Sequence, residues 1–68
     1  MKIKYFFDTD TALVEFNDNL VEETREISEN VYIDLDKKGN LVSMTIEHAK
    51  TTAQLPNISY QQIEKATA

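Results

Sequence analysis

The chain has no cysteine and no tryptophan, and its 68 residues include only one glycine and one proline. The absence of cysteine excludes a disulfide framework and thiolate metal ligands. A single glycine cannot build a glycine-rich loop that cradles a phosphate. No apolar run approaches the roughly 18 residues of a membrane span, and the opening run MKIKYFF lacks the continuous apolar core of a signal peptide. We therefore expect a cytoplasmic protein without a cofactor.

Basic residues are also scarce, since seven lysines and arginines face twelve acidic residues and the net charge is −5. Nucleic acids and anionic membrane surfaces need a basic protein surface, so we expect neither as a partner. A basic protein or a cation stays possible. An acidic surface that only keeps the protein in solution is the simpler explanation.

The length predicts a single domain with a small core and marginal stability. Hydrophobic residues make up 41% and charged residues 28%, a composition typical of folded chains. Without disulfides, added stability must come from a partner subunit, a metal held without thiolates, or efficient packing.

Apolar and polar residues alternate with a period of two through most of the first 48 residues, which indicates strands. We expect strands near 2–7, 12–17, 20–27, 31–36 and 41–47. Short, turn-rich connections favour hairpins, so residues 1–50 are predicted to form an antiparallel meander of four or five strands. The fold class is mainly β, or α+β at the margin. The segment 20–27 is polar on both faces and fits an edge strand, with a helix as the alternative.

The tail after residue 50 has a different character. Residues 51–58 read as a linker, and residues 59–68 as a short helix of the same domain. Ser59 and Gln62 have capping-box spacing, while Ile58 and Ile63 have hydrophobic-staple spacing. A helix of about two turns does not stand alone in water. It must dock on its own sheet or on a second copy.

A single sheet with one apolar face needs a cover, and this chain offers few residues to supply it. We therefore expect a symmetric homodimer. Phe6 and Leu13 fall on the face opposite Tyr5 and could form a second apolar patch. The predicted interaction surface comprises Phe6, Leu13, Ile58, Tyr60 and Ile63.

The stretch DLDKKGNL, residues 34–41, begins like a calcium loop but departs from that pattern at two ligand positions. Lys38 stands at position five and Thr45 at position twelve, where a bidentate glutamate is needed. A hairpin fits better, with Asp36 opening the turn and Gly39 supplying the residue with positive φ. Asp34 and Asp36 remain weak candidates for a divalent cation.

No arrangement of residues predicts a catalytic site. His48 has no second histidine or cysteine to complete a zinc site, and no Ser–His–Asp arrangement is evident. We expect no enzymatic activity; a small carboxylate-dependent hydrolase is the least favoured alternative.

Five features together resemble a known bacterial family: Tyr5, Asp10, and the runs at 11–18, 22–27 and 31–50. That family is domain of unknown function 2283 (DUF2283), and Asp34, Asp36, Gly39 and Glu47 carry the most specific spacing. Phe6 and Phe7 replace its usual Asp-Pro, and the segment Ser43-Met44-Thr45 departs from its last motif. The resemblance implies no activity. It suggests an antitoxin-like partner of a small basic toxin as an alternative to the leading hypothesis, a non-catalytic, homodimeric protein-interaction module.

Overall fold

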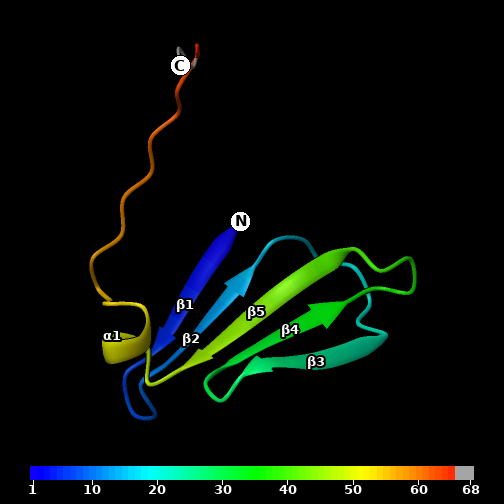
Figure 1. The fold of residues 1–68 in the computed structure, drawn as a ribbon, viewed down its shortest axis with the longest axis horizontal. Helices are drawn as coiled ribbons and strands as arrows, with labels where there is room; N and C mark the ends of the chain where they lie inside the picture. Colours follow the sequence, from blue (N-terminus) through cyan, green and yellow to red (C-terminus); the bar gives the residue numbers. More distant parts are fainter. Residues whose placement is uncertain (66–68) are drawn as a thin grey trace.

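The computed structural model describes residues 1–65, which form one five-stranded antiparallel sheet and one short helix (Figure 1). The mainly β fold class is confirmed. The elements are β1 (Lys2–Phe6), β2 (Thr11–Glu15), β3 (Glu23–Ser28), β4 (Val31–Leu35), β5 (Leu41–Glu47) and α1 (Ala49–Thr52).

The strand order is β1-β2-β5-β4-β3, so the predicted meander connectivity is wrong at one point. β5 lies between β2 and β4, as Figure 1 shows. The chain leaving β2 stays bound to the start of β5, because the backbone N–H of Phe16 donates to the carbonyl of Val42 over 2.9 Å. The connection then reaches β4, where Glu22 N donates to Leu35 O over 2.8 Å. It therefore carries β3 to the far edge of the sheet.

The polar segment predicted at residues 20–27 forms a strand rather than a helix, and it is an edge strand as predicted. Every residue of β3 is exposed. Leu20 and Val21, expected within this strand, belong instead to the connection that precedes it. The more apolar β2, β4 and β5 occupy the interior positions, which places the charged strand where it needs no apolar neighbour on either face.

Register separates the sheet into one apolar and one polar face. Opposed residues in antiparallel strands lie on the same face, and alternate residues along a strand do too. One apolar row therefore runs through Tyr5, Ala12, Ile46 and Val31. A second row runs through Ile3, Val14, Met44 and Ile33.

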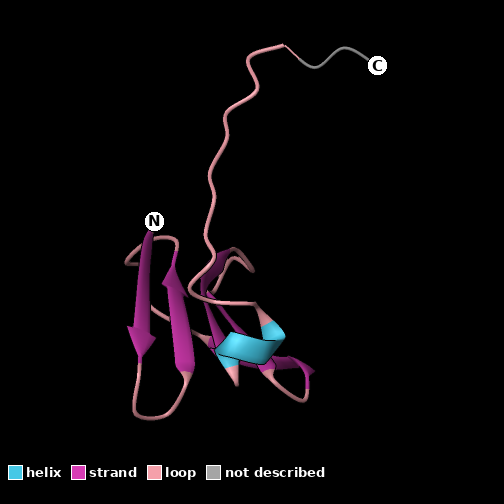
Figure 2. Ribbon diagram, turned by 90° about the vertical axis from the view of Figure 1, so that its left-hand side faces the viewer, coloured by secondary structure: helices cyan, strands magenta, loops and turns pink. Residues whose placement is uncertain are grey.

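The helix predicted over residues 59–68 is absent from its described part, 59–65, and residues 66–68 lie outside the described structure. The helix that forms is α1, at residues 49–52, and the tail beyond it runs away from the sheet (Figure 2). Local capping signals cannot hold so short a helix without a surface to dock on. Within residues 1–65, no helix has the length and apolar character needed to cross a membrane.

Candidate interaction surface

The apolar face of the sheet is only partly covered. We call the six incompletely buried aliphatic side chains of its two rows the open face. They come from four strands and are Ile3, Val14, Val31, Ile33, Met44 and Ile46. Ile3 is 41% exposed and the other five have intermediate exposure.

Interior strands normally bury the side chains on their core face, and here they do so only in part. Among the described residues, the buried apolar side chains are Ala12, Leu35, Val42 and Ala49. Ala49 belongs to α1, whose four residues cover one end of the sheet. The face lacks the second layer that a sheet requires to bury its apolar side.

The total exposed area exceeds that of a compact chain of this mass. The chain exposes 5744 Å², whereas a compact monomer of 7.8 kDa exposes about 4,400 Å² by the usual scaling with mass. The extended tail contributes to this excess of about 1,300 Å², since its Ile58, Tyr60 and Ile63 are largely exposed.

The polar face carries Asp34, one of the two carboxylates considered for cation binding. Both of its oxygens accept hydroxyl hydrogen bonds, from Thr24 to Oδ1 and from Ser43 to Oδ2, each 2.6 Å long. These bonds tie β3 and β5 to β4 across the sheet. Asp34 therefore has a structural role in joining three strands.

Asp36 serves the hairpin turn, as predicted. Its Oδ1 accepts the backbone N–H groups of Lys38 and Asn40 over 2.9 and 2.8 Å, and its Oδ2 accepts Asn19 Nδ2 over 3.1 Å. Hydrogen bonds from the Asn40 backbone, before those from the other donors, hold the pKa of Asp36 below its usual range. Gly39 has φ +83°, and its N–H donates to the carbonyl of Asp36 over 3.0 Å.

The two aspartates thus have separate partners rather than a shared site. Within residues 1–65, no group of three or more histidine, cysteine, aspartate or glutamate side chains is arranged to hold a metal ion.

Asp10 has a structural role that the sequence analysis missed. Its Oδ1 accepts the hydroxyl of Tyr5 over 2.6 Å and the backbone N–H of Lys50 over 3.1 Å, and its carbonyl accepts Ala49 N over 2.9 Å. The bond from Tyr5 is the main reason that the pKa of Asp10 is lowered, and the same bond raises the pKa of Tyr5. The separation of only five residues between Tyr5 and Asp10 was the signal in the sequence that could have indicated this pair.

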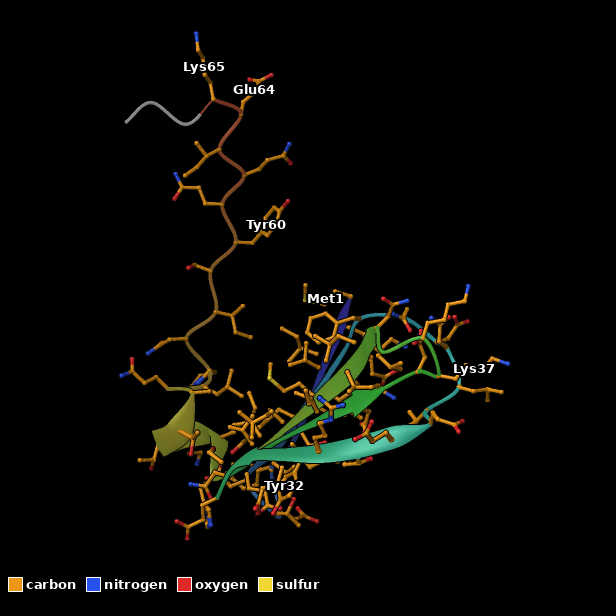
Figure 3. The ribbon with its side chains drawn as sticks, turned by 45° about the vertical axis from the view of Figure 1, so that its right-hand side comes forward. Met1, Tyr32, Lys37, Tyr60, Glu64 and Lys65 are labelled. Carbon is orange, nitrogen blue, oxygen red and sulfur yellow. The ribbon has the colours of Figure 1, made fainter. Side chains whose placement is uncertain are left out.

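A group of acidic side chains surrounds Tyr32 on the polar face. The charge of Glu47, then partial burial, then the charge of Glu26 raise the pKa of the Tyr32 hydroxyl. Glu29 adds a smaller effect. Three glutamates therefore act on the Tyr32 hydroxyl, and Figure 3 shows Tyr32 below the ribbon.

The residues predicted as an interaction surface lie in two separate places. Phe6 and Leu13 lie on the polar face, opposite Thr11 and Lys4, and Phe6 is 49% exposed. The tail residues Ile58, Tyr60 and Ile63 are 59%, 85% and 66% exposed. Figure 3 shows Tyr60 far from the sheet. The open face itself was predicted only as a surface that needs a cover.

His48 lies at the start of α1 with φ 52°, in the left-handed region. Its carbonyl accepts the backbone N–H of Thr52 over 2.8 Å, which closes the helical turn. The residue directs the chain out of β5 and into α1.

Comparison with known proteins gives one match. No curated protein and no solved structure matches the chain. A family model described as a protein of unknown function, DUF2283, matches residues 2–50, which include all five strands and the first residues of α1. Because that match covers most of the chain, including the Tyr5–Asp10 pair and the Asp36–Gly39 turn, this protein belongs to the DUF2283 family.

Proposed function

We propose that the protein is a non-catalytic protein-interaction module that acts as a homodimer through its open face. The observation that carries the proposal is the open face itself, two aligned apolar rows across the four neighbouring strands β1, β2, β5 and β4. In a dimer, the second copy supplies the layer that the chain lacks.

A stable protein–protein interface buries about 800 Å² on each partner. The open face spans four neighbouring strands, and the exposed tail residues Ile58, Tyr60 and Ile63 offer further apolar surface. A two-fold axis would place the same apolar rows on both sides of the interface, as closed homodimers require.

A binding role accounts for the polar residues better than an enzymatic one. Asp10, Asp34 and Asp36 are occupied in holding α1, the strands and the hairpin turn. Carboxylates committed to several hydrogen bonds are poor candidates for proton transfer or cation binding unless those bonds break. This supports the interaction module over the hydrolase and over the cation-binding domain.

Neighbouring residues of β5 provide a matched test, because Met44 lies on the open face and Thr45 on the polar face. We expect sedimentation equilibrium to show a dimer for the parent protein, a monomer for Met44→Lys and a dimer for Thr45→Lys. Circular dichroism establishes that both variants keep the strand content of the parent. A parent protein that stays monomeric at every accessible concentration would overturn the homodimer.

A basic protein, such as a small toxin, is the alternative partner. The acidic balance of the chain and the glutamates around Tyr32 are compatible with it. Co-purification of the tagged protein from its source distinguishes the two: capture of a small basic protein, retained in Met44→Lys because Met44 lies on the face opposite Tyr32, would favour the toxin partner.

A further inference from the structure

The outer edge of β1 is unpaired in the described structure. β1 stands at the end of the strand order and pairs only with β2. Such an edge presents a row of backbone N–H and C=O groups that can accept another strand. On the apolar side of the sheet, the other edge, β3, carries the charged Glu23 and Arg25, whereas β1 carries Ile3 and Tyr5 there and has its Lys2 and Lys4 on the polar side. β1 is therefore the more receptive edge.

The tail has the sequence of a strand. Residues 57–63, NISYQQI, contain no charged side chain, and apolar and polar residues alternate over 58–61, whereas Ile63 falls on the side of Ser59 and Gln61. In an extended chain, Ile58 and Tyr60 lie on one side and Ser59 and Gln61 on the other. β-branched and aromatic residues favour strands. The segment is not helical in the structure, and its apolar side chains are exposed.

We propose that residues 57–63 add as a sixth strand to the β1 edge of a second copy, antiparallel to β1. This inference rests on the proposed homodimer and assigns it a second contact. Ile58 and Tyr60 then extend the open face beside Ile3 and Tyr5. Ser59 and Gln61 lie on the polar side with Lys2 and Lys4, so no like charges meet.

The length of the tail fits this exchange. Seven extended residues span about 23 Å, more than the roughly 17 Å of the five-residue β1. α1 is fixed beside the end of its own β1 by the Ala49–Asp10 bond, and Lys50 Nζ lies 5.0 Å from the centre of the Phe7 ring. In the exchange, residues 53–56 carry the tail from there to the β1 edge of the second copy.

The course of the tail favours a second copy over its own sheet. Figures 1 and 2 show it leaving the sheet instead of turning along β1. Within residues 1–65, its backbone hydrogen bonds end with Asn57 N to Gln54 O, at 3.0 Å. Reciprocal exchange about a two-fold axis satisfies the β1 edges of both copies and leaves no open-ended contact.

The absence of cysteine makes disulfide trapping a clean test. Full-length Lys4→Cys is mixed with full-length Ser59→Cys or Gln61→Cys, the two are refolded together, and the mixture is oxidised. We expect a disulfide-linked heterodimer that forms several-fold faster than with the control, Glu26→Cys on the β3 edge. Using two tail positions covers a register shift of two residues.

Two results would overturn the exchange. The first is equal cross-linking at the β1 and β3 edges. The second is a monomeric, internally linked product from the double variant Lys4→Cys/Ser59→Cys, which would place the tail on its own sheet. Sedimentation of the cysteine-free parent separates the two proposals. A dimeric parent whose cysteine variants fail to cross-link refutes only the exchange, while a monomeric parent refutes the homodimer as well.

Discussion

The hydroxyl of Tyr5 donates a 2.6 Å hydrogen bond to Oδ1 of Asp10, across the turn between β1 and β2. Asp10 also binds the backbone of Ala49 and Lys50, and its own φ of 54° places it in the left-handed region. Aspartate tolerates this region better than most residues. One side chain thus connects the first strand to a helix about 40 positions later, and α1 depends on it because four residues do not hold a helix by themselves.

The Tyr5–Asp10 pair makes part of the stability dependent on pH. The folded pKa of Asp10 is lowered, mainly by the bond from Tyr5, relative to about 3.9 when unfolded. This contribution is present above the unfolded pKa and is lost as the pH falls through the folded pKa. We expect thermal melts below about pH 4 to fall less steeply with acid for Tyr5→Phe than for the parent.

The control for this measurement is Tyr60→Phe, which removes a hydroxyl from the tail. Glu15, Glu23 and Asp36 also have lowered pKa values, so the parent retains some acid sensitivity in every variant. Only the difference between the two tyrosine variants reports on Asp10. Parallel pH curves for both variants would show that the Tyr5 bond makes no contribution.

Gly39 closes the β4–β5 hairpin, and we expect Gly39→Val to destabilise the fold through backbone strain alone. No atom lies within 4 Å of the position a Cβ would occupy, so crowding plays no part. With φ at +83°, an L-residue other than glycine loses about 1–2 kcal/mol. Urea unfolding measures the change. Gly39→Asn should lose less, since asparagine tolerates left-handed conformations, and equal stability of all three proteins would contradict this role.

The success of the turn prediction and the failure of the tail prediction have one physical cause. The Asp36–Gly39 turn is defined by hydrogen bonds within five residues, so turn chemistry in the sequence was sufficient to predict it. The Ser59–Gln62 spacing is also a local signal, but a short helix forms only where a surface stabilises it. The capping residues can be read from the sequence, whereas the surface on which a helix would dock depends on the tertiary structure.

The strand order escaped prediction for a related reason. Alternation shows which side chains share a face but not which strands are neighbours. The place of β5 depends on contacts such as Asn17 Nδ2 to Leu41 O, 3.0 Å long, between residues 24 positions apart. Adjacent strands in the sequence pair most often, so the meander was the default expectation. The open face, by contrast, followed from alternation alone.

Asp34 joins β3 to the rest of the sheet, and we expect Asp34→Ala to loosen this edge strand. The variant removes the hydrogen bonds from Thr24 and Ser43 and should lose roughly 1–3 kcal/mol of stability. Amide exchange should quicken first in β3, an edge strand that pairs only with β4. Ser43→Ala is the control, because it leaves the Thr24–Asp34 bond intact; equal loosening of β3 in both variants would contradict the assignment.

Divalent cations provide a direct test of the alternative function. A ligand that binds only the folded state raises its melting temperature with concentration. Because the oxygens of Asp34 and Asp36 already accept hydrogen bonds from the protein, we expect no shift with millimolar calcium or magnesium. A rise that saturates with either ion, and that Asp34→Asn abolishes, would restore the cation-binding function.

The homodimer predicts that thermal stability depends on protein concentration. A second copy that binds only the folded chain stabilises it by mass action, so the melting temperature should rise across a dilution series. The dependence should vanish in Met44→Lys and persist in Thr45→Lys, since only Met44 lies in the open face. Both variants gain one positive charge, and the two substituted positions lie on opposite faces of the sheet. A melting temperature that is constant with concentration in the parent would contradict the homodimer.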